Sequence, residues 1–138
     1  MKIILMGQQA FGKSALEKFH NESDHEVVAV YCAPDKEGKP LDPVKEYAQS
    51  VNLPVFQPSN FKDQEVLDQI KSHDADLCVM AYVIIFVPEA ARDIPKHGSV
   101  CFHPSLLPLH RGPSSINWPI IGGATKTGLT IFYPNDGL

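Results

Sequence analysis

The stretch that ends at Pro108 contains residue types suited to acid–base chemistry. His103 follows a short apolar run, Val100 to Phe102, and opens a loop that prolines bracket at 104 and 108. Proline disfavours helix at and before its own position, so we expect a fixed loop here. In an open α/β sheet, ligands bind at the carboxyl ends of the strands. His103 is therefore a candidate acid or base, and a structural histidine is the alternative.

A second motif, Gly7 to Ser14, matches the G-x-x-x-x-G-K-S pattern of phosphate-binding loops. In such a loop, backbone N–H groups surround the phosphates, and the Lys and Ser side chains reach the γ-phosphate and the metal ion. The bulky inner residues Gln8, Gln9 and Phe11 fit this role poorly, and no later strand ends in an acid suited to Mg²⁺. We expect a strand-to-helix turn with Lys13 in solvent, and a nucleotide-binding protein is kept as an alternative.

The composition is that of a single globular domain. The chain has 138 residues, of which 43% are hydrophobic and 20% charged, and its formal net charge is −4. This length is enough for one core, and we assign residues 1–138 to one domain. No apolar run approaches the ~20 residues of a membrane span, and no secretory signal is expected. The acidic balance does not supply the basic face that several nucleic-acid phosphates require.

The three cysteines, Cys32, Cys78 and Cys101, all lie in apolar segments. Reduced thiols in a core are typical of cytoplasmic proteins, and we expect that compartment. No C-x-x-C pair is present, and Cys101-x-His103 alone is a weak metal signal. We therefore expect no metal site.

Alternating strands and helices predict an α/β fold. The expected strands are 3–6, 27–31, 53–56, 77–82, 100–102 and 128–133, and the expected helices are one around Ala15 to Phe19, 43–51 after Asp42, 61–72 and 114–121. Strands that are apolar without alternation are typical of parallel sheets covered on both faces. The fold is expected to be Rossmann-like and doubly wound, with a mostly parallel sheet and helices on both faces. Trp118 is expected to pack in the core.

The sequence resembles the 10-formyltetrahydrofolate-dependent formyltransferases over nearly the whole chain. The matching segments are MKIILMGQQAFG, APDKEGKP, DPVKEYAQSVNLPVFQP, AYVIIFVP, HGSVCFHPSLLPLHRGPSSINWPII and GLTIFYPNDGL. His-Pro-Ser-Leu-Leu-Pro followed by Arg-Gly is highly specific. The family includes methionyl-tRNA formyltransferase, glycinamide ribonucleotide and sugar formyltransferases, and the folate-hydrolysing domain of 10-formyltetrahydrofolate dehydrogenase. Members often carry glycine and Phe-Gly where this chain resembles a phosphate-binding loop.

The resemblance implies transfer of a formyl group from N10 of the folate co-substrate, with three catalytic side chains. The family's His corresponds to His103, as acid/base and oxyanion stabiliser. Cys101 stands where the transferases have Asn, and a thiol is a weak donor; losing one oxyanion donor costs about 10²–10³ in rate. The family's Asp would be at position 139, so the chain is expected to be a catalytic domain truncated just before it. Asp136 would need a different loop path to replace it.

The resemblance also implies contacts for the folate and the acceptor. The pterin ring is expected against the loop after the fourth strand, which comprises Tyr82, Val83, Ile84, Ile85 and Phe86, and under a second loop of Asn135, Asp136 and Gly137. The alternatives are that the first loop is plain core and the second a plain turn. Arg111 and Ser105 are the candidates for the acceptor side, and Arg111 can equally be a solvated surface residue.

Three functions stay open within the resemblance. The expected reaction is transfer to an amine acceptor, with initiator methionyl-tRNA as the acceptor in one branch. Hydrolysis to tetrahydrofolate and formate is the alternative, since the dehydrogenase's hydrolase domain also lacks the Asn and has Phe-Ile-Pro where this chain has Phe86 to Pro88. A folate-binding module without catalysis is the third. The sequence leaves the oligomeric state open.

Overall fold

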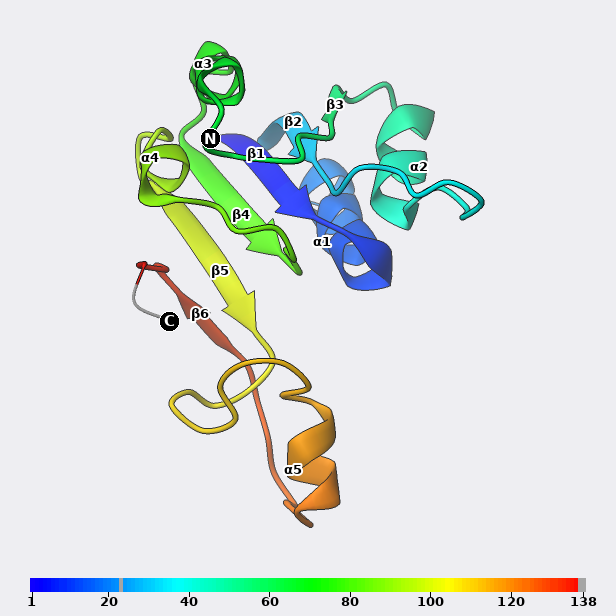
Figure 1. The fold of residues 1–138 in the computed structure, drawn as a ribbon, viewed down its shortest axis with the longest axis vertical. Helices are drawn as coiled ribbons and strands as arrows, with labels where there is room; N and C mark the ends of the chain where they lie inside the picture. The colour runs from blue at the N-terminus through cyan, green and yellow to red at the C-terminus, as the bar shows by residue number, and fades with distance from the viewer. Residues whose placement is uncertain (23, 137–138) are drawn as a thin grey trace.

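A six-stranded sheet forms the centre of the computed structural model, which describes residues 1–22 and 24–136. The strands are β1 (Lys2–Gly7), β2 (Glu26–Tyr31), β3 (Val55–Phe56), β4 (Leu77–Ala81), β5 (Ser99–His103) and β6 (Thr130–Phe132). The helices are α1 (Gln9–Asn21), α2 (Pro43–Ser50), α3 (Gln64–Ser72), α4 (Glu89–Arg92) and α5 (Asn117–Ile121). Figure 1 shows their arrangement.

The strand order β3-β2-β1-β4-β5-β6 confirms the predicted doubly wound fold. Strands β1 to β5 pair in parallel, and β6 pairs antiparallel to β5. The order reverses between β1 and β4, and that reversal is where open α/β sheets bind ligands at the carboxyl edge. The sequence had predicted the strands without their order, because their patterns are all equally apolar.

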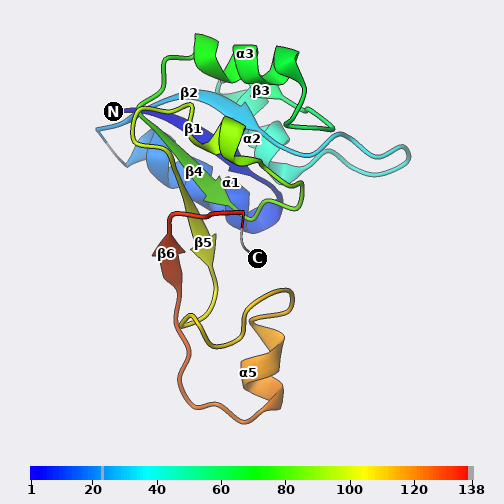
Figure 2. The same ribbon diagram turned by 60° about the vertical axis from the view of Figure 1, so that its left-hand side comes forward.

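Two apolar layers cover the sheet. Leu16 of α1 and Val44 of α2 pack with Leu5 and Val30 on one face. Ile70 of α3 and residues of α4 pack with Ile4, Met6 and Met80 on the other, a layer that Cys101 joins. Figure 2 shows α3 and α1 on opposite sides of the strands. Both faces are therefore buried, which explains the apolar strands.

The helix predicted for residues 114–121 is shorter than expected. It begins at Asn117, because Ser114 has a φ of 59° and so lies outside the right-handed helical region. Pro119 is at the third helical position, where its missing N–H would have no partner within the helix, and not at the weak end that the sequence indicated.

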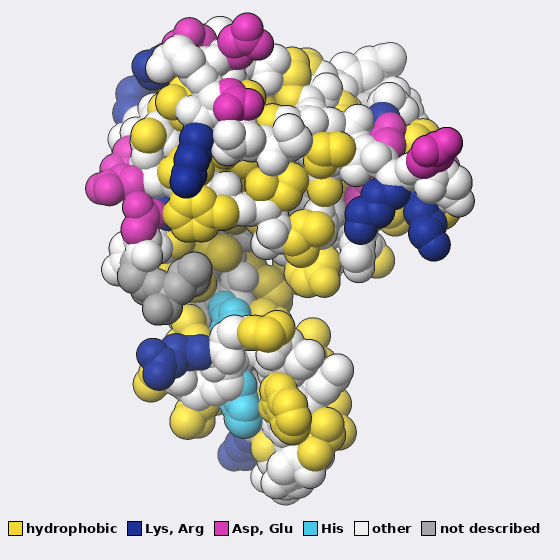
Figure 3. All heavy atoms as spheres, viewed as in Figure 1, with side chains coloured by type: hydrophobic (Ala, Val, Ile, Leu, Met, Phe, Trp, Pro, Cys, Tyr) yellow, Lys and Arg dark blue, Asp and Glu magenta, His cyan; other side chains and the backbone are white. Residues whose placement is uncertain are grey.

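Helix α5 lies in a lobe that extends away from the sheet, as Figures 1 and 2 both show. The prediction that Trp118 packs in the core is wrong, because this residue is 59% exposed and the lobe places it beyond the sheet. Ile116, Ile120 and Ile121 are exposed in the same lobe, and Figure 3 shows apolar side chains over its surface. In the part of the chain that the structure describes, no helix has the length and apolar character to cross a membrane.

The Gly12 position explains why a glycine lies inside α1. A Cβ built there would be 2.8 Å from Cγ2 of Val44, 3.1 Å from the carbonyl carbon of Gly7 and 3.2 Å from the carbonyl oxygen of Ala81. Two of these three atoms belong to the backbone and cannot rotate away. The glycine thus lets α1 approach β1, β4 and α2 closely.

We predict that Gly12→Ala destabilises the fold, although alanine usually favours a helix interior over glycine by about 1 kcal/mol. The overpacking should lower the free energy of unfolding by about 1–3 kcal/mol, measured by chemical denaturation. Ser14→Ala, which changes an exposed residue of the same helix, is the matched control and should change it by less than about 0.5 kcal/mol. A Gly12→Ala protein as stable as the parent would contradict this packing.

Candidate functional site

The phosphate-loop motif does not form a phosphate-binding loop. Helix α1 begins at Gln9, so Gly12, Lys13 and Ser14 lie within the helix instead of at its start. The Gly12 N–H donates to the Gln8 carbonyl at 3.1 Å, and Lys13 pairs with Glu17 at 3.5 Å on the surface. Backbone N–H groups committed to a helix cannot surround a phosphate. The alternative of a nucleotide-binding protein therefore loses its structural basis.

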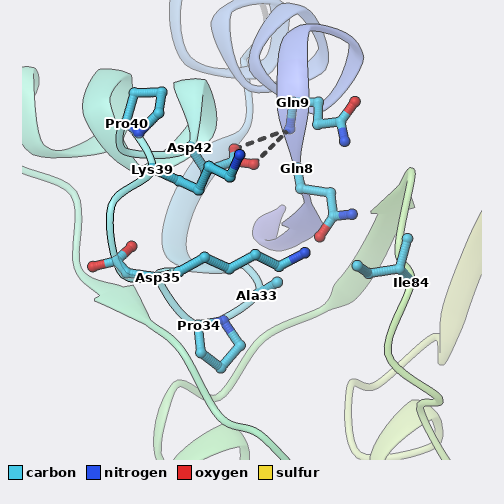
Figure 4. Close-up of a pocket in the computed structure, with 10 residues that line it drawn as sticks. Gln8, Gln9, Ala33, Pro34, Asp35, Lys39, Pro40, Asp42 and Ile84 are labelled. Atoms are coloured by element: carbon cyan, nitrogen blue, oxygen red, sulfur yellow. Dashed lines mark hydrogen bonds between the residues drawn. The ribbon is translucent and has the colours of Figure 1, made fainter.

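A small polar pocket lies at the start of α1, with a volume of about 170 Å³. Figure 4 shows Gln8 pointing into it and Ile84 at its side, across from the segment that contains Ala33 and Asp35. Asp42 accepts hydrogen bonds from the Gln9 N–H at 2.9 Å (Oδ1) and from the Val44 N–H at 2.9 Å. The predicted cap of α2 is thus confirmed, and the same carboxylate also holds Gln9, whose φ is 58°.

His103 ends β5 and is half-buried. Its Nε2 lies 2.9 Å from the carbonyl oxygen of His110. A carbonyl oxygen only accepts, so Nε2 must carry the proton, and in the neutral ring Nδ1 is the unprotonated nitrogen. The loop between the two histidines therefore selects the tautomer that leaves Nδ1 able to take up a proton.

Cys101 precedes His103 by two residues, so alternation along β5 places both on one face of the sheet. The Cys101 thiol donates to the Phe102 carbonyl at 3.6 Å. Burial raises the pKa of this thiol, which keeps it protonated at neutral pH. Cys101 is accordingly a neutral and weak hydrogen-bond donor.

A cavity of about 410 Å³ opens on this same face of the sheet. Its walls are mainly apolar and come from strands β4, β5 and β6, the loops that follow β4 and β6, and helix α4: Met80, Val83, Ile84, Ile85, Phe86, Val87, Arg92, Cys101, Phe132, Tyr133, Pro134 and Asn135. Two polar groups, Arg92 and Asn135, interrupt the apolar wall. A site of this kind suits a flat ring with a few hydrogen-bonding atoms.

This cavity is lined by most of the residues that we expected to contact the pterin ring. Val83 to Phe86 form one wall and Asn135 another, so the structure brings together loops far apart in the sequence. Asp136 reaches the cavity through an ion pair with Arg92. Gly137 lies outside the described residues.

Tyr82 is separated from this group. It lines a different cleft of about 470 Å³, on the α1 side of the sheet, together with Phe11 and Phe102. The Phe11 and Phe102 rings stack with centroids 4.2 Å apart. Tyr82 therefore does not share a cavity with Val83 to Phe86, and its φ of 66° accompanies a turn of the chain directly after β4; its contact with the folate stays a prediction.

The two residues expected on the acceptor side have different environments. Ser105 is fully buried at 0% exposure, and its hydroxyl donates to the Leu109 carbonyl at 2.7 Å. Its own carbonyl accepts from the Thr130 hydroxyl at 2.8 Å. Ser105 therefore holds the loop to β6 with its hydroxyl engaged inside the loop, and its acceptor contact stays a prediction. Arg111 is exposed in the same loop, and its acceptor role stays a prediction.

Sequence reasoning missed Arg92, Phe132 and Tyr133 as lining residues of the cavity. Arg92 follows two alanines in a short segment and has the pattern of a solvated surface residue. Only the fold places it against the loop after β6. Within residues 1–22 and 24–136, no three His, Cys, Asp or Glu side chains are grouped as a metal ion would need, and the expectation of no metal remains a prediction.

Comparison with known proteins defines the class of this chain. The formyl transferase family matches residues 1–138. A methionyl-tRNA formyltransferase of Fusobacterium nucleatum is 41% identical over the whole chain, which covers 46% of that protein. A cytosolic 10-formyltetrahydrofolate dehydrogenase of Xenopus tropicalis is 40% identical, and the chain covers 16% of it. The chain thus spans less than half of each relative.

Solved structures share the fold. A phosphoribosylglycinamide formyltransferase from Anaplasma phagocytophilum superimposes with a TM-score of 0.81 at 22% identity, over 100% of this chain and 66% of the other. A formyltetrahydrofolate deformylase from Pseudomonas syringae gives 0.75 at 21% identity, over 99% and 47%. These proteins have the same α/β architecture as this chain. With the family match over its full length, this chain belongs to the formyl transferase family.

Asp42 at the small pocket gives a stability prediction. Asp42→Ala should lower the free energy of unfolding by about 1–2 kcal/mol, because backbone N–H groups at the starts of two helices lose their acceptor. Asp63 begins α3 without a side-chain cap bond, so Asp63→Ala is the matched control and should cost less than half as much. Thermal or denaturant unfolding of both variants measures the difference, and equal costs would contradict the assignment.

Proposed function

We propose that this chain binds 10-formyltetrahydrofolate in the 410 Å³ cavity and takes part in transfer of its formyl group. The observation that carries the proposal is the position of this cavity. It has the Val83–Val87 wall and Asn135 around it, Cys101 in its lining, and His103 two residues further on the same face. The resemblance found in the sequence supports the same residues by an independent route.

The chemistry of the cavity fits a pterin. Branched and aromatic side chains such as Ile85, Phe86 and Phe132 offer contact area to a flat ring. Backbone groups of an irregular loop and the Asn135 amide can meet the ring's polar edge. The formyl-bearing N10 would then lie toward the carboxyl end of β5, where His103 ends the strand.

His103 has the properties of the acid/base that this reaction needs. The acceptor atom forms a bond to the formyl carbon, the bond from that carbon to N10 breaks, and tetrahydrofolate leaves. A proton must leave the acceptor, and N10 must gain one. Nδ1 of His103 is able to take up the first proton, because Nε2–H is engaged by the His110 carbonyl.

We assign the chain to the N-terminal, folate-binding and catalytic part of such an enzyme. The family's catalytic acid would then be at position 139, directly after Leu138. An acidic side chain there would stabilise the protonated imidazole. A cytoplasmic location also remains a prediction, supported by three cysteines that are free thiols.

The acceptor is an amine or water. The methionyl-tRNA formyltransferase similarity favours an amine acceptor such as initiator methionyl-tRNA. Hydrolysis to tetrahydrofolate and formate is favoured by one observation, namely that Cys101 is a weak, neutral donor directed at the Phe102 carbonyl. A weak donor stabilises the oxyanion poorly, and the proposal is that transfer to an amine depends on this donor more than hydrolysis does.

The next prediction concerns His103 and the acid expected at position 139. In a chain extended by an aspartate after Leu138, His103→Ala should lower turnover of 10-formyltetrahydrofolate by about 10²–10⁴-fold, with an unchanged melting temperature. His97→Ala, which removes an exposed histidine, is the control and should leave turnover unchanged. Production of tetrahydrofolate measures the rate.

Three outcomes would contradict this assignment. Equal turnover by the extended and unextended chains would show that position 139 does not hold the acid. Folate binding without turnover in the extended chain would show a binding module and not an enzyme. ATP or GTP binding that Lys13→Ala abolishes, without folate binding, would restore the nucleotide-binding alternative.

A further prediction concerns the choice between an amine and water as the formyl acceptor. Cys101→Asn should raise formyl transfer to methionyl-tRNA relative to formate release, because an amide N–H is a stronger donor to the developing oxyanion than a thiol. Cys101→Ala adds no donor and is the matched control. Quantifying formylmethionyl-tRNA against formate gives the ratio, and the same ratio in both variants would argue that donor strength does not separate the reactions.

A further inference from the structure

A buried arginine lies at the wall of the folate cavity. Arg92 ends the short helix α4 and is 5% exposed. Its Nη1 donates to the Val87 carbonyl at 3.0 Å, and its Nη2 pairs with Oδ1 of Asp136 at 2.6 Å. Its own carbonyl accepts from the Ser99 hydroxyl at 2.7 Å. The guanidinium is therefore held from both sides.

The guanidinium is not fully satisfied. Its Nε is buried and has no hydrogen-bond partner among the described residues. Burying a charge and an unpaired donor lowers the stability of a fold. Replacing such a group by an apolar side chain of similar size often leaves the stability unchanged or raises it. Fold stability alone thus gives a weak reason for an arginine at position 92.

The two partners of Arg92 belong to opposite walls of one cavity. Val87 ends the loop that runs from Val83, which forms the wall after β4. Asp136 follows Asn135, which belongs to the wall after β6. Strands β4 and β6 do not pair with each other, since β5 lies between them. The Arg92 side chain bridges loops that the backbone ladder does not join directly.

Asp136 is the exposed partner of this pair. Its side chain is 52% exposed, whereas that of Arg92 is 6% exposed. The arginine is fixed by Val87 and by packing, so the ion pair draws the exposed loop toward a rigid anchor. A planar guanidinium can hold a carbonyl and a carboxylate at once, which the single ammonium of lysine does less well.

We propose that Arg92 is a positioning residue for the folate co-substrate. By holding Asp136 and the Val87 carbonyl, it sets the distance between the two loops that would contact the pterin ring. This inference rests on the proposed function and adds a residue to it. Arg92 acts on the affinity for the ring through the loops, whereas His103 acts on the chemical step.

The test is a double-mutant cycle on tetrahydrofolate binding. In the chain extended by an aspartate, Arg92→Leu and Asp136→Asn should each raise the Kd for tetrahydrofolate by about 10-fold or more, measured by calorimetry. The double variant should be no weaker than either single variant, because both changes break one interaction. Arg92→Lys should give an intermediate Kd, since lysine can keep the Asp136 contact.

Turnover separates positioning from a general structural role. KM for 10-formyltetrahydrofolate should rise with Kd in the Arg92 and Asp136 variants, while kcat stays within about threefold, because His103 is untouched. Lys96→Leu is the matched control: it breaks another ion pair, Lys96 with Asp76 at 3.2 Å, outside the cavity lining. Its Kd should equal that of the parent.

The outcomes distinguish this inference from the function on which it rests. A parent chain that does not bind tetrahydrofolate overturns the proposed function, and this inference with it. A parent that binds, together with Asp136→Asn and Arg92→Leu variants whose Kd is unchanged, overturns only the role of Arg92. If Arg92→Leu fails to fold, Asp136→Asn decides alone, because its exposed side chain can change without loss of the core.

Discussion

The parallel pairing of β4 with β5 is the constraint on which the rest of the site depends. Its register sets Met80 beside Cys101, so both strands end at the same edge of the sheet. The loop after β4 therefore lies close to the end of β5. A shift of the strand register by one residue would exchange the buried and open faces of the strand. Strand β6 pairs antiparallel with β5 and begins beside His103, so it ends with Phe132 beside Cys101, and the loop that follows β6 starts there.

Alternation along β5 divides the edge into two sides with different chemistry. Cys101 faces the cavity that we assign to folate, and Phe102 stacks on Phe11 in the cleft of the α1 side. His103 continues the first side at the point where the strand ends. One strand thus separates two recesses in the surface, a geometry suited to bringing a donor and an acceptor to a shared rim.

Particular residues show how far the sequence could predict this structure. Buried strands such as residues 3–6 and 77–81 were predicted because both faces are covered, which leaves an unbroken apolar pattern. The Asp42 cap was predicted because Asp before Pro is a strong local signal. Trp118 was misplaced because local composition does not report that its helix lies in a lobe beyond the sheet. The hydrogen bond from the Ser105 hydroxyl to the Leu109 carbonyl could not be predicted, because a hydroxyl in a loop can donate to a ligand or to a nearby carbonyl equally well.

The sequence by itself determined the family, the strands, three of the helices and the histidine at the end of the fifth strand, since each of these depends on residues adjacent in the chain or on a specific local motif. Only the tertiary structure decided which residues share a cavity. Arg92 and Asp136 meet because β5 and β6 bring their loops together, and the tautomer of His103 follows from where the His110 carbonyl lies. Such contacts depend on the strand order and register of a folded sheet, which similar apolar segments do not specify.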